Sequence, residues 1–247
     1  MKKINWLIFL ALLLKVIPGF SQDYGNVYEF PIKPGTEAWK EFKTGQEMKD
    51  ACQIPAHILK TMSTEALVNT YLNYPLLSTI YAYNSIQIGF EKITQDFNGL
   101  QELLRRNDAL GSTLKIYKQI DANVIDKTWT AEQKGGFSFK FSYLEILMAQ
   151  PELLRNLTLE ERKNLVEESL NKFKAKDENP DIFGGFGLLT SALVMGRVIE
   201  EKDLPATLQT TAETTKSPMK IFLDNAIVQD TQVINQIVID AQSYLRR

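Results

Sequence analysis

Residues 55–109 read PAHILKTMSTEALVNTYLNYPLLSTIYAYNSIQIGFEKITQDFNGLQELLRRNDA, and this stretch predicts helices separated by short turns. Ser63 stands where an N-cap residue accepts hydrogen bonds from the free backbone N–H groups of a first helical turn. Glu65 follows within that turn, where the helix dipole favours a negative charge. Tyr74 precedes Pro75, and because the residue before a proline is disfavoured in a helix, we expect the first helix to end there.

A second helix is predicted to start at Pro75. Proline has no backbone N–H, which is tolerated in the first turn because N–H groups there have no partner inside the helix. Apolar residues then recur every three or four positions, the spacing of one helix face: Ile86, Phe90, Ile93, Phe97, Leu100 and Leu104. Asn98-Gly99 interrupts the pattern with a pair that favours turns. Either the helix continues through Gly99, or it ends near Asn98 and a short helix follows; we favour the second.

The first 21 residues have the pattern of a signal peptide. Lys2 and Lys3 form a basic start, Trp6–Leu14 is an apolar run of nine residues, and Gly19 and Ser21 are small residues at the positions read by signal peptidase. Nine apolar residues are too few to span a membrane, which takes about 20. We therefore expect cleavage after Ser21, a periplasmic or secreted protein, and no transmembrane anchor after cleavage.

Charge and cysteine content narrow the classes of partner. The chain carries 28 basic and 30 acidic residues, and removal of Lys2, Lys3 and Lys15 leaves 25 against 30, a net charge of −5. A net negative charge argues against nucleic acid as the main partner, because phosphate binding needs a basic surface. Cys52 is the only cysteine, so no internal disulfide is possible. Residues 22–247 are long enough for one substantial domain, which we expect to be a single unit.

The remaining segments are also predicted to be helical, except for an extended region at 22–35 that contains two prolines and two glycines. Thr36 can cap a short helix, and Thr44 with Glu47 fits a capping box. Residues 121–136 resemble a loop. Alternating aromatic residues at 137–143 could form a strand, but no comparable strand exists to pair with it, so we predict a helix over about Phe139–Ala149.

A second capping box, Thr158 with Glu161, predicts a long helix, and Gly184-Gly-Phe-Gly187 leads into an apolar one. A Thr-rich connection at 201–217 precedes two last helices at about 217–227 and 230–246. Residues 75–79 (PLLST) faintly resemble residues 187–191 (GLLTS), which is compatible with a repeated helix pair. The predicted fold is all-α, with antiparallel helix pairs arranged as an α-solenoid or as an irregular helical bundle.

Four segments carry a family resemblance: MSTEALVNTYLNYPLL (62–77), FNGLQELLRRNDA (97–109), the neighbourhood of Lys127-Thr-Trp129, and IFGGFGLLTSALVMGRV (182–198). Together they resemble a family of secreted, functionally uncharacterised proteins of Bacteroidota. The resemblance covers most of residues 22–247. It implies export and an all-helical fold, and it implies no particular chemistry.

Few residues point to catalysis. His57 is the only histidine, and with one histidine and one cysteine a conventional zinc site is not expected. Cys52 and His57 could act as nucleophile and base, but their spacing favours a half-buried thiol and a surface imidazole. Gly184–Gly187 could bind an anion on backbone N–H groups, although it lacks the lysine of a P-loop and a tight turn is favoured. No metal or cofactor is predicted.

Carboxylates are plentiful, and two of them could flank a glycosidic bond. The sequence gives no reason to choose a pair, and solvated helix faces and caps explain them equally. The candidates are Glu65, Glu91, Asp96, Glu102, Asp108, Glu145 and Glu161.

One patch of aromatic and amide side chains is a candidate binding site for sugars or peptides, because aromatic faces beside hydrogen-bonding groups suit such ligands. It comprises Tyr71, Tyr74, Tyr83, Asn84 and Gln87, with Tyr81 nearby. Tyr81 and Tyr83 cannot share one helix face, so some of these tyrosines must pack in the core.

The sequence therefore predicts an exported helical binding or scaffold module with a peptide, protein or glycan partner in the cell envelope. The alternative is a carboxylate-dependent enzyme acting on envelope or dietary glycans. An enzyme requires a concave pocket with convergent acids, whereas a binding module requires a broad groove or an exposed apolar patch.

Overall fold

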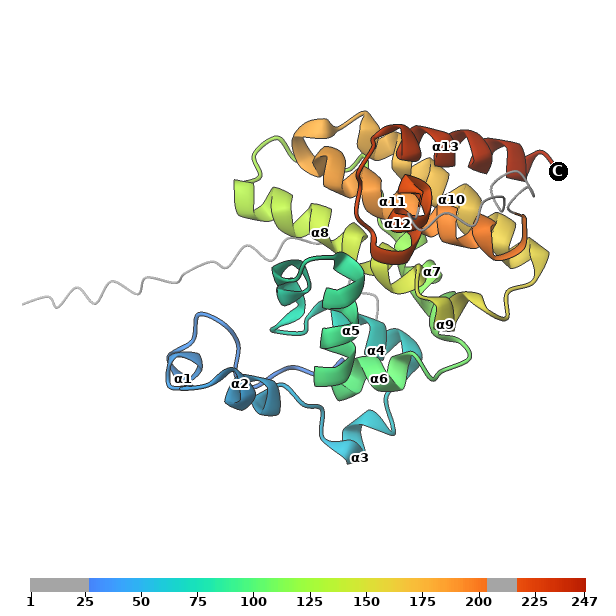
Figure 1. The fold of residues 1–247 in the computed structure, drawn as a ribbon. Coiled ribbons are helices and arrows are strands. Elements are labelled where there is room, and N and C mark those ends of the chain that lie inside the picture. Colours follow the sequence, from blue (N-terminus) through green and yellow to red (C-terminus); the bar gives the residue numbers. More distant parts are fainter. Residues whose placement is uncertain (1–26, 204–216) are drawn as a thin grey trace, which may run out of the picture.

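The computed structural model describes residues 27–203 and 217–247, and every regular element in them is a helix (Figure 1). The N-terminal elements are α1 (Glu37–Lys40), α2 (Gly45–Ala51), α3 (Ala56–Leu59), α4 (Thr64–Leu72), the 3₁₀ helix η1 (Leu77–Ala82), α5 (Ile86–Asp96) and α6 (Asn98–Leu103). The C-terminal elements are α7 (Ala109–Gln119), α8 (Ala131–Met148), α9 (Pro151–Leu154), α10 (Leu159–Asp177), α11 (Pro180–Asp203), α12 (Pro218–Asn225) and α13 (Gln232–Leu245). The all-α prediction is confirmed.

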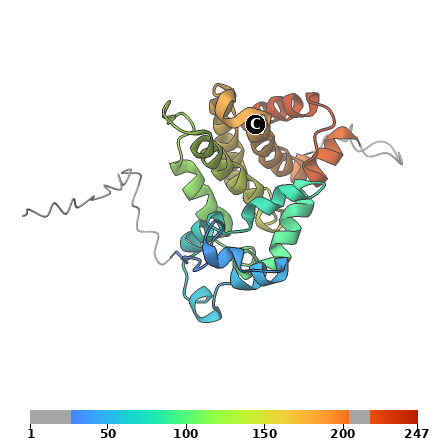
Figure 2. The same cartoon turned by 90° about the vertical axis from the view of Figure 1, so that its left-hand side faces the viewer.

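Helix α11 lies at the centre of the C-terminal part, where it packs against α8, α10, α12 and α13. The helices from α1 to α6 gather below this group in both views, and α5 meets α12 while α4 meets α7 and α8 (Figures 1 and 2). Because α11 is surrounded by non-successive helices, the arrangement is an irregular bundle and not a row of stacked pairs.

Helix starts that depend on neighbouring residues alone follow the sequence. The Ser63 hydroxyl accepts a hydrogen bond from the Ala66 N–H at 3.1 Å. Thr44 and Thr158 form complete capping boxes at the starts of α2 and α10. These caps satisfy N–H groups that have no partner inside the helix, so each fixes where its helix begins.

The prediction that the second helix starts at Pro75 is wrong. After Pro75 the chain forms η1, and a new helix, α5, starts only at Ile86, with the Ser85 hydroxyl accepting from the Ile88 N–H at 3.1 Å. The cause is tertiary packing: η1 turns back onto α5, and a Cβ at Gly89 would lie 2.0 Å from the Ile80 carbonyl oxygen. Only a glycine at position 89 permits this approach.

The predicted break near Asn98 is confirmed, because α5 ends at Asp96 and α6 begins at Asn98. Phe97 between them has an extended backbone, with φ −127° and ψ 111°. The Asn98 side chain accepts from the Ile54 N–H at 3.0 Å and donates to the Ile54 carbonyl at 2.8 Å. This amide therefore completes the backbone hydrogen bonding of a distant turn and holds it against the break.

Residues 137–143 are helical, as predicted, but their helix begins earlier than predicted. Thr130 and Gln133 form a capping box that starts α8 at Ala131, so the second half of the expected loop at 121–136 is helix. Gly135 and Gly136 lie within this helix. The cap and the apolar face that follows outweigh their poor helix propensity.

The Gly184–Gly187 segment was expected to be a turn leading into a helix, and a break of this kind occurs at Gly184, where two helical segments within α11 meet at a kink. Gly184 has φ 53° and ψ −170°, a conformation almost restricted to glycine, and it bends the helix. Residues 75–79 lie at η1 and residues 187–191 lie inside α11, so the faint sequence similarity between them does not mark a structural repeat.

One helix in the described part of the chain, Pro180–Glu200, is long and apolar enough to cross a membrane, and 61% of its most apolar window is buried in the bundle. Its apolar character is accounted for by its central position. The predicted signal peptide and most of the Thr-rich connection, up to residue 216, fall outside the described residues. The two last helices are confirmed as α12 and α13.

Candidate functional site

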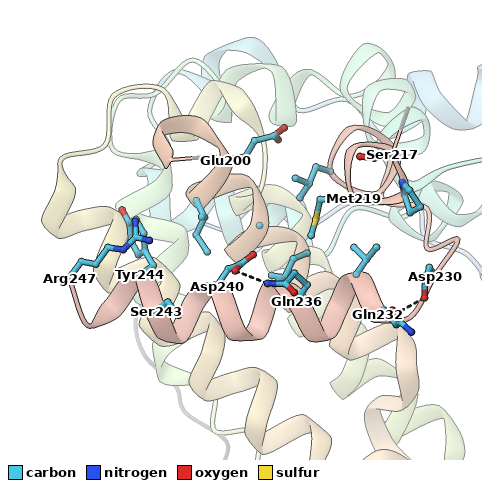
Figure 3. Close-up of a pocket in the computed structure, with 16 residues that line it drawn as sticks. Glu200, Ser217, Met219, Asp230, Gln232, Gln236, Asp240, Ser243, Tyr244 and Arg247 are labelled. Carbon is cyan, nitrogen blue, oxygen red and sulfur yellow. Dashed lines mark hydrogen bonds between the residues drawn. The ribbon is translucent and has the colours of Figure 1, made fainter. Parts of the chain in front are cut away.

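A groove of about 570 Å³ lies between α11, α12 and α13 (Figure 3). Helix α13 forms one side of the groove and carries Gln232, Gln236 and Asp240, while Met219 of α12 and Glu200 of α11 lie on the opposite side. A volume of this size falls in the range of ligand-binding cavities. The groove is therefore the candidate functional site.

Helix α13 presents two parallel rows of side chains to the groove. Val233, Ile237 and Tyr244 are almost fully buried and form part of an apolar floor together with Leu223. The second row is polar and lies beside the first: Gln232, Gln236, Asp240, Ser243 and Arg247. An apolar floor with a polar wall suits a ligand that is apolar on one side and polar on the other.

Gly196 lines the groove where side chains of α12 and α13 pack closely against α11. At Gly196 of α11 a Cβ would lie 2.6 Å from Leu223 Cδ2 and 3.1 Å from Ile237 Cδ1. Because glycine has no side chain, α12 and α13 approach α11 closely at this level. Ser217 starts α12 by accepting a hydrogen bond from the Lys220 N–H at 3.2 Å.

The rim of the groove is acidic. Asp240 accepts a hydrogen bond from the Gln236 amide at 2.9 Å, and Asp230 accepts from the Gln232 N–H at 2.9 Å (Figure 3). Glu200 lies 3.4 Å from the Lys220 ammonium. Each of these carboxylates keeps further acceptor capacity, because a carboxylate can accept about four hydrogen bonds.

A second cavity of about 630 Å³ lies between α5, α9, α11 and α12 and shares Glu200 and Leu223 with the groove. It is also lined by Gln87, Glu91 and Arg197. The two cavities therefore meet at the end of α11.

The Arg197 guanidinium holds the wall between the cavities in place. It donates to the carbonyls of Leu223 at 2.8 Å, Ala149 at 2.9 Å and Asp224 at 3.3 Å, and to the Gln87 side chain at 2.8 Å. Burial lowers the pKa of this guanidinium to about 10, while neighbouring carboxylates oppose that shift. It remains charged at neutral pH.

The structure separates the aromatic and amide residues predicted as one binding patch. Tyr71 is fully buried and donates to the Tyr143 carbonyl at 3.2 Å, and Tyr74 is buried with its ring 4.1 Å from that of Phe97. These two tyrosines belong to the core, so the five residues do not form one surface.

The remaining members of the patch differ in their surroundings. Tyr83 is 40% exposed and Asn84 is exposed, in the connection between η1 and α5. Gln87 lines the second cavity, where it contacts Arg197. Tyr81 packs against three aromatic rings from α8 and α11, namely Phe139, Tyr143 and Phe186.

A buried cluster of charged and hydroxyl groups connects α7, α8, α10 and α11. The Lys176 ammonium lies 2.6 and 2.7 Å from the two oxygens of Glu145, and both side chains are completely buried. Glu145 also accepts hydrogen bonds from the hydroxyls of Tyr117, Thr190 at 2.5 Å and Ser191 at 2.7 Å.

Burial lowers the Lys176 pKa, and the neighbouring carboxylate opposes that change. Lys176 also donates to the Gly187 carbonyl at 3.0 Å and to Ser191 at 3.0 Å. Because these contacts satisfy both charges and neither cavity reaches the cluster, its role is to hold the four helices in register.

The other sequence candidates are not brought together into a catalytic arrangement. Cys52 is fully buried, burial raises its thiol pKa to about 11, and His57 lies exposed on α3. No group of three or more potential metal ligands occurs among the described residues. An ideal Cβ at Gly184 or Gly185 would meet no neighbouring atom within 4 Å, so close packing does not require glycine at either position, whereas the positive φ of Gly184 favours it.

Most of the predicted carboxylates have structural partners. Ion pairs hold Glu65 with Lys115, Asp96 with Lys49, and Glu102 with Arg106, in addition to the buried Glu145. Asp108 accepts from Thr64, and Glu161 completes the cap of α10. Glu91 differs, because it lines the second cavity.

Sequence reasoning missed the groove, although part of its signal was present. The spacing of Gln232, Gln236 and Asp240 places three polar residues in one row beside the apolar stripe of the last helix. What the sequence could not indicate is that α12 and the end of α11 stand opposite this row.

No protein-family model matches the chain, and comparison with curated proteins and with solved structures gave no significant match.

Proposed function

We propose that this protein is an exported helical binding or scaffold module that holds its partner in the groove between α11, α12 and α13. The observation that carries the proposal is the groove itself: about 570 Å³, with an apolar floor from three helices and a row of polar side chains along one wall. Proteins that bind peptides on helical surfaces use this combination, because the floor supplies burial and the wall supplies orientation. Export rests on the signal-peptide pattern of the first 21 residues.

Site-specific photo-crosslinking tests the proposal. A photoreactive phenylalanine derivative replaces Gln236 in the groove and, in a second protein, the exposed Glu167 on α10 as a matched control. Both proteins are incubated with the envelope of the source cell and irradiated. A specific product at position 236 that is absent at position 167 is expected. Equal labelling at both positions, or none at 236, would contradict the assignment of the groove.

A second candidate function is favoured by one observation, the carboxylates of Glu91, Glu200 and Asp224 around the second cavity. Two carboxylates across a cavity are the requirement for hydrolysis of a glycosidic bond. A screen of envelope and dietary glycans with the native protein and Glu91→Gln tests this alternative. Turnover that depends on Glu91 would favour an enzyme over a binding module.

A further inference from the structure

We infer that the groove selects a cationic peptide segment, one that inserts apolar side chains and places lysine or arginine residues beside them. This inference rests on the proposed function and names the class of ligand. Three carboxylates line the groove, those of Glu200, Asp230 and Asp240, against the single guanidinium of Arg247. The charge of the lining is thus complementary to a basic ligand.

The second cavity is also lined mainly by carboxylates among its charged residues. It adds Glu91 and Asp224, and its one basic residue is Arg197. That guanidinium directs its donors at three backbone carbonyls and Gln87. A ligand that follows the groove towards Glu200 therefore approaches more carboxylates than cations.

The protein already holds one ammonium group at this junction. Lys220 of α12 lies 2.8 Å from Asp224 and 3.4 Å from Glu200, and its pKa is raised mainly by the hydrogen bond to Asp224. The contact to Glu200 is the longer one, and the Glu200 side chain is 24% exposed. A ligand ammonium can therefore pair with Glu200 without breaking the closer bond of Lys220.

The polar row on α13 favours a peptide over a lipid. Gln232, Gln236 and Ser243 offer donors and acceptors along the whole groove, which suit the N–H and C=O groups of a peptide backbone. An acyl chain has no groups that can form hydrogen bonds with these side chains. The acidic rim would also repel the anionic headgroups of a bacterial membrane.

Fluorescence anisotropy with three synthetic peptides tests the inference. The first is a short labelled peptide with leucines on one helix face and lysines on its flanks; the second has glutamates in place of the lysines, and the third has serines in place of the leucines. The lysine–leucine peptide is expected to bind at least about tenfold more tightly than the other two, because each loses one of the two complementary features. Its affinity should weaken with added salt.

Variants assign the selectivity to the rim. The double variant Glu200→Gln, Asp240→Asn removes two charges and keeps the shape of both side chains. It should bind the lysine–leucine peptide about tenfold more weakly, with an affinity close to that for the glutamate peptide. Glu167→Gln on α10 removes the charge of an exposed side chain that lines neither cavity, and it should leave binding unchanged. Circular dichroism melting confirms that each variant is folded.

The outcomes separate this inference from the proposed function. Equal binding of the lysine and glutamate peptides, with crosslinking at position 236 retained, would leave the groove as a binding site and overturn its cationic selectivity. Sedimentation of the peptide-free protein with phosphatidylglycerol vesicles, lost in the Glu200→Gln and Asp240→Asn double variant, would identify a membrane surface as the occupant and also overturn it. Absence of both peptide binding and crosslinking at position 236 would overturn the two proposals together.

Discussion

Replacing Lys176 with methionine should destabilise the protein far more than replacing Lys176 and Glu145 together. In Lys176→Met the packing against the Phe141 and Phe183 rings, now 5.2 and 5.9 Å from the ammonium, is largely kept. The Glu145 carboxylate, however, loses the ammonium that lies 2.6 Å from it in a completely buried site. Breaking a buried ion pair in this way costs about 3–5 kcal/mol.

The magnitude can be converted into a melting temperature. For a chain of this size, each kcal/mol shifts Tm by about 2–4 °C, so Lys176→Met should lower Tm by about 6–20 °C. The loss should be smaller at acidic pH, because an unpaired buried carboxylate takes up a proton instead of remaining charged.

Glu145→Gln combined with Lys176→Met removes both charges and leaves an amide oxygen to accept from Tyr117 and Ser191. The double variant should therefore lose less than the sum of the single variants, with a coupling free energy of at least about 2 kcal/mol. Urea unfolding of the four proteins measures this double-mutant cycle. Additive losses, or a loss below about 1 kcal/mol for Lys176→Met, would refute the assignment of the cluster as a buried ionic connection.

Three further results are expected. Stability should fall as pH rises above about 9, because five buried phenols and one thiol have raised pKa values, so the unfolded chain releases protons that the folded chain keeps. Burial lowers the pKa values of Lys140, Lys176 and Arg197, and these three groups act in the opposite direction against the six. The urea midpoint measures stability across this pH range, and tyrosinate absorbance reports the ionisation of the phenols. The groups with raised pKa values are Cys52, Tyr71, Tyr74, Tyr81, Tyr117 and Tyr143, and the pKa of Tyr143 is about 12. Gly89→Ala should lower stability by about 1–3 kcal/mol, because the new Cβ would overlap the Ile80 carbonyl. Gly111 has open space around it, so Gly111→Ala should raise stability by about 0.5–1 kcal/mol. Thermal melts of the two variants compare these effects directly. Thr158→Ala removes the cap of α10 and should cost about 1 kcal/mol by the same measurement, and an unchanged Tm would contradict the role of that capping box.

Features that depend on neighbouring residues were predictable from the sequence. Ser63, Thr44 and Thr158 cap their helices as expected, since a cap needs only a side chain and the N–H groups two or three residues later. The helix over 137–143 was also recovered, by the physical argument that a lone strand would leave its backbone groups unpaired.

Features that depend on distant packing were not predictable. The turn of η1 onto α5 requires the approach of Ile80 to Gly89, which no local pattern encodes. Tyr71 and Tyr74 carry the same side chain as Tyr83, yet the first two are buried and the third is exposed. The groove depends on three helices that meet only in the folded chain, so its residues could not be gathered from spacing alone.

The four contacts of Arg197 have a mechanical consequence for α12. One guanidinium ties the carbonyls at the end of this helix to α8 through Ala149 and to α5 through Gln87. A ligand that pushes α12 away from α13 would have to break these hydrogen bonds or move the Arg197 side chain with the helix. Because Arg197 also contacts Gln87, which lines the second cavity, such a movement would alter that cavity. Occupancy of one cavity would then change affinity in the other, and by thermodynamic linkage the effect would be reciprocal.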